Sequence, residues 1–547
     1  MISPRYLVAF TGHRNLSNPA PVARALSEAL QGLQKRVEAA GGKLEFYGSI
    51  AYGADTLAVA AARELNIPVH LILPKAVVTD PATGRPDPRK GFAADFWDGD
   101  PAAGGVFRTS DWSRTLQQIE DARAGVNGGT LRVIAGGQTA PECYYEAGMQ
   151  TLEVADVLLA VWDGVNNGKL GGTSHLLAAA TAMGKPRITL PVNGGASMET
   201  GLDTALARES PCRKVFDRVK NCAGHPCVKC KDMPGTFASL FQRLSDCSNH
   251  MADRFRKSLV WIIAWHGFAT LVAAVAAILP QTGLEWKVTL AALALLETVL
   301  VGLAIVRTQR LRQQEVHEHW LDARVATEQM RVLSDCGGLL DPLHPLIARK
   351  KSDWRRFAIT VGLMCHSETP PPPEWRDARD MYLRNRLTGE SGQINYFGGK
   401  GERAAKSYKR TLTAGWMLGI AAMLVVALAF VFKVCGIVAK IHHASFPAPL
   451  SDPAADGLSW IFAILFLLLP IALPLTAGVF ISLRTALDLG RRRFRYLELA
   501  DYLRSAKQEL ETLDTEATVR RCVERTEDTL LGELLEWHLA EQQNGAH

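Results

Sequence analysis

The chain has 547 residues, of which 48% are apolar and 21% are charged, and its formal net charge is +6 at pH 7. This length exceeds a single small module, and the apolar share excludes disorder as the main state. A net charge of +6 over this length is too small to indicate nucleic-acid binding, and no direct nucleic-acid partner is therefore expected. The ten cysteines lack the pattern of a secreted disulfide framework, which favours a reducing, cytoplasmic environment.

Residues 1–205 alternate short apolar segments with segments of helical spacing. The first segment is followed at once by a turn and lacks the pattern of a signal peptide. The predicted strands are 6–10, 44–47, 69–74, 157–162 and 187–190, and the predicted helices are 22–39, 56–65 and 174–183. Apolar strands that alternate with helices are typical of a parallel sheet covered on both faces. The sequence therefore predicts an α/β, Rossmann-like, parallel-sheet domain.

Glycine-rich turns follow three of these strands and open one helix, at residues 11–12, 48–53, 163–164 and 168–173. Ligands of parallel sheets bind at the carboxyl ends of the strands. Glycine lets backbone N–H groups approach an anion closely, and a helix N-terminus adds a favourable dipole. Arg14 is a suitable phosphate partner, whereas His13 is either a ligand contact or a turn residue packed beside the strand. Residues 171–173 are either a phosphate-binding turn or an ordinary loop and helix cap.

Known phosphate-binding motifs narrow the class of protein. No Gly-x-x-x-x-Gly-Lys-Ser/Thr occurs, which excludes a P-loop NTPase, and no strict Gly-x-Gly-x-x-Gly follows the first strand. Four other motifs occur together, at residues 11–14, 48–58, 146 and 171–173. Their combination resembles the SLOG superfamily, a Rossmann-like group that contains the DNA-processing protein A domain and the cytokinin-activating phosphoribohydrolases. The resemblance covers about residues 1–200 and implies a nucleotide-derived ligand held by these loops.

The resemblance, together with the turn after residues 157–162, assigns a set of nucleotide-binding residues: Thr11, Gly12, His13, Arg14, Gly48, Gly53, Asp55, Glu146, Asp163, Gly171, Gly172 and Thr173. The hydrolase members carry Pro-Gly-Gly-x-Gly-Thr-x-x-Glu, whose Glu works in catalysis. This chain has Leu170-Gly171-Gly172-Thr173-Ser174-His175-Leu176 instead, with no proline and with Leu176 where that Glu should stand. The resemblance therefore implies nucleotide binding and no catalytic residue, with Glu146 or Asp163 as the alternative carboxylate.

A cysteine cluster lies in the expected connector, residues 206–257. Cys227-x-x-Cys230, with Cys222 and His225 nearby, has the spacing of zinc ligands. The second Cys-x-x-Cys of a zinc ribbon is missing, so ordinary thiols are the alternative to a zinc site. No other cofactor is expected besides the nucleotide ligand.

Four apolar segments reach the length of about 20 residues that a helix needs to cross a bilayer. They are residues 258–284, 288–306, 411–432 and 457–483. The second contains Glu297, and the fourth contains Pro470 and Pro474, which predict a kink. Lysine and arginine flank the outer ends of both pairs, and positive charge stays on the cytoplasmic side. The sequence predicts two membrane hairpins in a bacterial inner membrane, with both termini cytoplasmic.

The two hairpins, predicted as residues 258–369 and 370–547, look like a duplication. Trp320-Leu321-Asp322 follows the second apolar segment and Tyr496-Leu497-Glu498 follows the fourth, each at the start of a predicted helix. The alternative is chance similarity of two amphipathic helices. Prolines at 370–373 indicate a stiff linker between the copies.

A Gln393-x-x-Tyr396 helix runs into basic residues and the third segment. This arrangement resembles the SLATT family, two-transmembrane-helix domains associated with nucleotide-second-messenger conflict systems in bacteria. The two resemblances together imply a nucleotide-sensing, homo-oligomeric membrane effector that forms a pore or disrupts the membrane in anti-phage defence. The alternative function is a membrane-anchored nucleotide- or NAD-processing enzyme. An ionisable residue inside a membrane segment is a functional candidate, so Glu297 either lines a pore or bonds across an oligomer interface.

Overall fold

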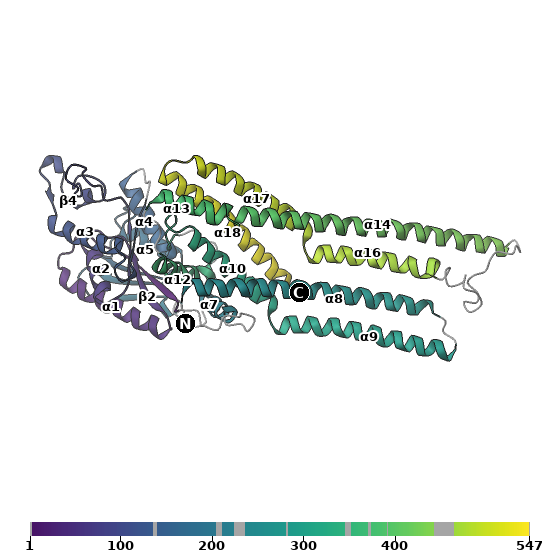
Figure 1. Cartoon of the computed structure of the whole chain (residues 1–547). Helices are drawn as coiled ribbons and strands as arrows, with labels where there is room; N and C mark the ends of the chain where they lie inside the picture. Colours follow the sequence, from purple (N-terminus) through teal and green to yellow (C-terminus); the bar gives the residue numbers. More distant parts are fainter. Residues whose placement is uncertain are drawn as a thin grey trace. The chain divides into compact units, whose positions relative to one another are not determined.

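The computed structural model describes residues 3–134, 139–203, 211–223, 236–279, 283–344, 352–369, 374–390, 392–441 and 464–545 (Figure 1). The chain forms two compact units. The first, called the sheet unit, contains Met1–Cys247, Asp322–Asp380 and Leu513–His547; the second, called the hairpin unit, contains Ser248–Leu321 and Met381–Thr512. These units do not follow the linear order of the predicted segments, because residues between and after the hairpins join the sheet unit.

A seven-stranded sheet is the centre of the sheet unit. Its strands are β1 Arg5–Gly12, β2 Lys43–Gly48, β3 Val69–Leu73, β6 Thr130–Val133, β7 Val157–Trp162, β8 Arg187–Pro191 and β9 Met198–Thr200. Their order is β6-β3-β2-β1-β7-β8-β9, and every neighbouring pair is parallel except β8 and β9. The five predicted strands and the Rossmann-like parallel sheet are confirmed. The chain changes direction across the sheet between β1 and β7, which makes their carboxyl ends the topological switch point.

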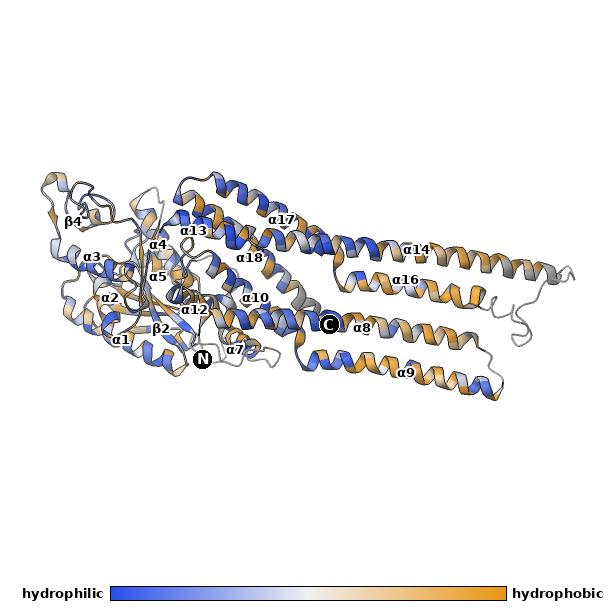
Figure 2. Cartoon of the chain, in the orientation of Figure 1, coloured by the Kyte–Doolittle hydropathy of each residue, from blue (hydrophilic) through white to orange (hydrophobic). Residues whose placement is uncertain are grey.

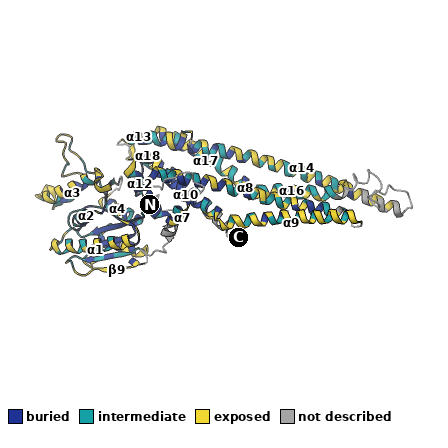
Figure 3. Ribbon diagram, turned by 60° about the horizontal axis from the view of Figure 1, so that its bottom comes forward, coloured by how far each residue is buried: buried dark blue, intermediate teal, exposed yellow. Residues whose placement is uncertain are grey.

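Helices cover both faces of the sheet. Alternate residues of β1 point to opposite faces, so Tyr6, Val8 and Phe10 join one apolar core and Leu7 and Ala9 join the other. The first core is covered by α1 Pro19–Ala39, α2 Ala54–Glu64 and α3 Thr109–Arg123, and the second by α4 Ala140–Val154 and α5 Thr173–Ala182. Figure 3 shows the buried strands between these helices. The helices on each face therefore shield the apolar side chains of the strands from water.

Local sequence explains where α1 begins and ends. Proline occupies its first turn, where no intrahelical N–H bond is needed. Its buried residues recur every three or four positions: Val22, Leu26, Leu30, Leu33 and Val37. Gly41 follows with φ +75°, a conformation that favours glycine, and the N–H of Gly42 bonds the carbonyl of Val37.

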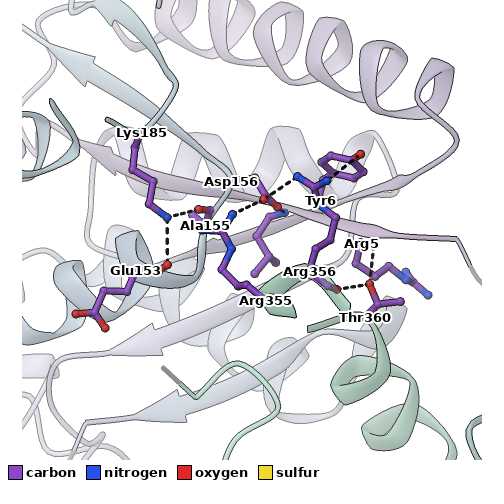
Figure 4. Close-up of polar contacts among 10 residues, drawn as sticks. Arg5, Tyr6, Glu153, Ala155, Asp156, Lys185, Arg355, Arg356 and Thr360 are labelled. Atoms are coloured by element: carbon purple, nitrogen blue, oxygen red, sulfur yellow. Dashed lines mark hydrogen bonds and ion pairs between the residues drawn. The ribbon is translucent and has the colours of Figure 1, made fainter. Parts of the chain in front are cut away.

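The sheet unit also contains helices from later in the chain: α7 Pro211–Ala223, α12 Ser352–Glu368 and α18 Glu516–Gly545. Ile359 and Leu363 of α12 pack into the core beneath β1. The N–H of Arg5 in β1 donates to Thr360 Oγ1 of α12 at 3.0 Å (Figure 4). The helix α12, predicted to belong with the first membrane hairpin, thus completes one face of the sheet.

The hairpin unit contains the four predicted membrane helices. Four helices in the described residues are long and apolar enough to cross a membrane. They lie in α8 Phe237–Ile278, α9 Leu284–Gln313, α14 Gln393–Ile441 and α16 Leu469–Ala486, and Figure 2 shows their apolar lengths. Trp416 is 70% exposed and Leu295 is 66% exposed. Large apolar side chains this exposed suit lipid and not water.

Both hairpins end in the same way. Glu315 after α9 has φ +46°, and Asp488 after α16 has φ +47°, which is uncommon for residues other than glycine. A second helix starts after each break, α10 Val316–Asp335 in the first copy and α17 Leu489–Thr512 in the second. Each pair of apolar helices is therefore followed by a residue of positive φ and a further helix, while the duplication itself stays a prediction.

The fourth apolar segment is interrupted close to its prolines. The π-helical turn Ile464–Leu468 directly precedes α16, Pro470 lies in the first turn of α16, and Pro474 lies inside it. Irregular turns beside prolines are common where a helix bends. The four-proline linker at 370–373 lies outside the described residues.

Candidate functional site

The switch point brings together the ends of two strands and the starts of two helices. Thr11 Oγ1 near the end of β1 lies 3.4 Å from Thr173 Oγ1 in the first turn of α5. The N–H of Ala54, the first residue of α2, donates to the carbonyl of His13 at 3.0 Å. The predicted motifs at residues 11–14, 53–55 and 171–173 are therefore adjacent, although more than a hundred residues separate the first from the last.

His13 is held by the end of β7. Its Nδ1 lies 3.2 Å from the carbonyl oxygen of Val161, and its Nε2 lies 3.1 Å from Asp163 Oδ2. The backbone N–H of Val165 and the His13 ring together hold the pKa of Asp163 below its ordinary value. Asp163 is therefore a carboxylate that orients His13, and its charge makes it a poor direct partner for an anion.

Arg14 lies among aromatic rings. Its guanidinium carbon is 5.7 Å from the centroid of Tyr52 and 5.1 Å from that of Tyr144. Burial alone lowers the pKa of Arg14, but Tyr144, Asp95 and Asp55 outweigh this effect and raise it. The side chain is thus a fixed cation beside the carboxyl end of β1.

The residues around Arg14 come from several parts of the chain: Lys75, Asp95 and Arg108 lie between β3 and β6, whereas Tyr52 precedes α2 and Tyr144 lies on α4. Tyr144 donates a hydrogen bond to Asp95, which also accepts one from Lys75 Nζ at 2.9 Å. Arg108 lies 4.6 Å from the ring centroid of Tyr52. The sequence prediction missed these side chains, because they are scattered over the chain without a motif.

Asp55 joins the glycine-rich turn to β1. Its Oδ2 accepts the N–H of Ala51 at 3.0 Å, and its carboxylate also interacts with the N–H of Gly12. Burial raises the pKa of Asp55 to about 7, although Ala51, Arg14 and Gly12 act in the opposite direction. Its charge therefore changes near neutral pH, next to the Arg14 cation.

Three of the predicted glycines are required by close backbone approach. A Cβ on Gly53, which has φ +92°, would lie 2.1 Å from the carbonyl oxygen of Arg14. A Cβ on Gly171, with φ +71°, would lie 2.5 Å from the backbone nitrogen of Tyr145, and one on Gly12 would lie 2.5 Å from the Cβ of Ala54. These glycines hold the strand ends and helix starts together.

Gly172 and Gly48 differ from those three. The nearest atom to a Cβ on Gly172 is the carbonyl oxygen of Lys169 at 3.2 Å, so this position is less crowded. Gly172 is the N-cap of α5, and no side chain caps that helix. Gly48 ends β2 inside the sheet, opposite Phe10 in register. Gly172 is therefore available to a ligand at the helix start, whereas Gly48 serves strand packing.

The helices α2 and α5 both begin at the switch point without a side-chain cap. Their N-caps are Gly53 and Gly172, and neither has a side-chain hydrogen bond to the first turn. In α2 the N–H of the first residue, Ala54, already donates to the carbonyl of His13, so only the following N–H groups face outward from this helix start. The first N–H groups of a helix have no intrahelical acceptor, and the helix dipole favours an anion there. Together with Arg14, these two helix starts form a cationic environment at the ends of β1 and β7.

Both carboxylates considered for catalysis already have a hydrogen-bond partner, Asp163 with His13 and Glu146 with Gln150, and the position of the hydrolase Glu is occupied by Leu176. Leu176 is 6% exposed, and its Cδ1 lies 2.7 Å from where a Cβ on Gly148 would stand, so it packs α5 against α4. Glu146 lies on α4 and accepts a hydrogen bond from Gln150 Nε2 at 3.2 Å. The position of the hydrolase Glu is thus an apolar packing site.

The other predicted sites lie elsewhere. Cys222 is buried on α7, while Cys227 and Cys230 lie outside the described residues. No group of three possible metal ligands occurs among the described residues. Glu297 of α9 is half-buried, four residues from both Leu293 and Val301, which pack against the apolar cluster shared by α8 and α9. Glu297 therefore lies on the side of α9 that meets α8.

Comparisons with protein-family models, curated proteins and solved structures gave no match to this chain.

Proposed function

We propose that this protein is a membrane effector that binds a nucleotide-derived anion at the carboxyl ends of β1 and β7. The observation that carries this proposal is the convergence of Arg14 with the uncapped starts of α2 and α5. Phosphate oxygens accept hydrogen bonds from guanidinium and from helix N-terminal N–H groups, and both are adjacent here. The exposed ring of Tyr145, stacked on His175 at 5.3 Å, offers an aromatic face beside the same helix start.

The second part of the proposal concerns the response. The same chain contains four helices that are long and apolar enough to cross a membrane, so ligand binding can be coupled to a change in the membrane. By its resemblance to SLOG and SLATT proteins, the chain is a homo-oligomeric effector of bacterial anti-phage defence that opens a pore in the inner membrane or disrupts it. The ligand acts on the membrane part only if it binds one arrangement of the chain better than another.

The alternative is a membrane-anchored enzyme that processes nucleotides or NAD. Hydrolysis of the SLOG type needs a carboxylate where Leu176 is buried against α4. Burying an unpaired carboxylate at this position is costly, so no small local change restores it. We therefore favour binding without turnover.

Calorimetry of the full chain in lipid nanodiscs, against linear and cyclic nucleotides, tests the binding. Arg14→Ala is expected to weaken the best ligand by roughly ten- to a hundredfold, because a hydrogen bond to a charged group contributes about 1.5–3 kcal/mol. Arg24→Ala is the matched control, because Arg24 is an exposed cation on the same domain. Equal affinity of both variants would place the ligand elsewhere, and turnover of a bound nucleotide or of NAD would favour the enzyme.

A further inference from the structure

Two aromatic rings meet beside the uncapped start of α5. Tyr145 lies on α4 and is 36% exposed, and His175 is the third residue of α5. Their ring centroids are 5.3 Å apart and their ring planes differ by 22°, which is a stacked arrangement. One face of the Tyr145 ring is therefore covered by the imidazole of His175, although Tyr145 stays open to solvent.

The backbone fixes the His175 ring. The N–H of Gly171 donates to Nδ1 of His175 at 3.2 Å. A backbone N–H can only donate, so Nδ1 carries a lone pair and the ring is the neutral tautomer with its proton on Nε2. Because Gly171 directly precedes the N-cap residue Gly172, this bond ties the imidazole to the turn that opens α5.

The same turn packs against the backbone of Tyr145. Gly171 has φ +71°, and a Cβ at this position would lie 2.5 Å from the nitrogen of Tyr145. The N–H of Gly172 donates to the carbonyl of Lys169 at 3.1 Å, which closes the turn. Since His175 lies in the first turn of α5, the ring pair stands next to the helix N–H groups that favour an anion.

The charged side chains beside the ring pair leave this surface open to an anionic ligand. On α4, the carboxylate of Glu142 accepts the N–H of Thr139 at 2.8 Å, and that of Glu146 accepts Gln150 Nε2 at 3.2 Å. Lys169, in the loop before the turn, is exposed and has no ion pair among the described residues. The two nearest carboxylates of α4 are thus held within α4 and its N-cap.

We propose that the Tyr145–His175 pair binds the planar base of the ligand, which stacks on the face of the Tyr145 ring opposite His175. This inference rests on the proposed function and deepens it, because it adds a base as a second recognised group beside the phosphate. Stacking on an aromatic ring suits any base, since every base has a π-face. Leu170, which precedes Gly171 and is 43% exposed, adds apolar surface next to the turn.

Two probes with the same sugar and phosphate separate the base from the anion. They are adenosine 5′-monophosphate and ribose 5-phosphate, titrated calorimetrically into the full chain in lipid nanodiscs. We expect the nucleotide to bind roughly five- to a hundredfold more tightly, the range that stacking of one base on an aromatic side chain provides. Tyr145→Ala should remove this preference and leave the affinity for ribose 5-phosphate unchanged, whereas Tyr145→Phe keeps the ring and should retain the preference.

His175→Asn provides a second variant. The amide oxygen of asparagine replaces Nδ1 as the acceptor for the N–H of Gly171, but asparagine has no ring to support Tyr145. This variant should therefore lose part of the preference for the nucleotide and keep its affinity for ribose 5-phosphate. Arg14→Ala, by contrast, should weaken both probes, because Arg14 acts on the phosphate.

Three results would overturn the base site. They are equal affinity of the unchanged chain for the two probes, equal weakening of both probes in Tyr145→Ala, which would make Tyr145 a support of the turn, and loss of the preference in Tyr145→Phe. Circular dichroism checks that the variants are folded, and His175→Asn gives the same comparison if Tyr145→Ala aggregates. Failure of both probes to bind the unchanged chain would contradict the proposed function as well, so the two failures are distinguishable.

Discussion

The carboxylate of Asp156 lies 2.7 Å from the guanidinium of Arg355, although 199 residues separate the two in the chain. Asp156 precedes β7, and Arg355 lies on α12 (Figure 4). Arg356 approaches the same oxygen at 3.1 Å, and the N–H of Leu7 donates to the other oxygen at 2.9 Å. The Arg356 guanidinium also lies 3.9 Å from the ring centroid of Tyr6. This buried network fixes α12 to the sheet.

Removing the charge of Asp156 should destabilise the sheet unit. Asp156→Asn leaves Arg355 and Arg356 without their carboxylate, and breaking a buried ion pair costs about 3–5 kcal/mol. Thermal unfolding of the full chain, followed by tryptophan fluorescence, is expected to shift to lower temperature. Glu120→Gln, which removes an exposed carboxylate paired with Arg123, should change stability by no more than about 0.5 kcal/mol. Similar shifts in both variants would mean that the network is not important for stability.

The Asp156 carboxylate also makes the stability of the fold depend on pH in the acidic range. Burial alone raises the pKa of Asp156, but Arg356 and Arg355 outweigh it and lower the pKa to about 2, from an ordinary value of 3.8. The carboxylate therefore stabilises the fold fully above about pH 4, and this contribution is lost as the pH falls toward 2. Thermal unfolding between pH 5 and pH 2.5 should show a smaller loss of stability in Asp156→Asn than in the unchanged chain.

The sequence predicted the strands well because each buried strand of a parallel sheet is a local apolar run. The short strands β6 and β9 were missed because they contain polar residues such as Arg132 and Glu199. The turns of the candidate site were also predictable, since their glycines are local signals. The positions of Tyr144 beside Arg14 and of α12 beneath β1 were not predictable, because both depend on packing between distant segments.

Binding of an anionic ligand should depend on pH through Asp55. Its pKa of about 7 means that it loses its proton between pH 6 and pH 8, and the resulting carboxylate competes with the ligand for Arg14. Affinity is expected to fall as the pH rises, by up to about tenfold per pH unit for one linked proton. Calorimetry at pH 6, 7 and 8 on the full chain measures this slope. The slope should flatten in Asp55→Asn and persist in Asp80→Asn, which changes an exposed loop; a slope that Asp55→Asn does not alter would assign the proton to another group.

Gly171 should tolerate a side chain far less than Gly168, although both have positive φ. A Cβ on Gly171 would overlap the backbone at Tyr145, whereas nothing lies within 4 Å of a Cβ on Gly168. Gly168→Ala is expected to cost about 1 kcal/mol, and Gly171→Ala about 3 kcal/mol or more, because it adds a clash to the backbone strain. The clash also displaces Tyr144, so ligand affinity should fall in Gly171→Ala alone. Equal unfolding temperatures for the two variants would mean that the turn moves to make room.

Substitution of Glu297 tests whether the proposed membrane response is the opening of a cation-conducting path. It lies inside an apolar helix, on the side that meets α8, where an unpaired carboxylate is costly unless water or another polar group reaches it. If signalling opens a water-filled path along the seam between α8 and α9, Glu297 lines it and attracts cations. Glu297→Gln keeps the size of the side chain and removes its charge, so it should reduce cation conductance without changing ligand affinity.

The measurement is depolarisation of cells, or ion flux from vesicles, on addition of the ligand identified by calorimetry. Thr298→Ala is the matched control, because Thr298 is exposed on the same turn of α9 and its hydroxyl donates to the carbonyl of Ala294 in its own helix. We expect normal flux in Thr298→Ala and a smaller, less cation-selective flux in Glu297→Gln. Unchanged flux and selectivity in Glu297→Gln would make the carboxylate a packing residue of the hairpin, and the conducting path would then have to lie away from the seam between α8 and α9.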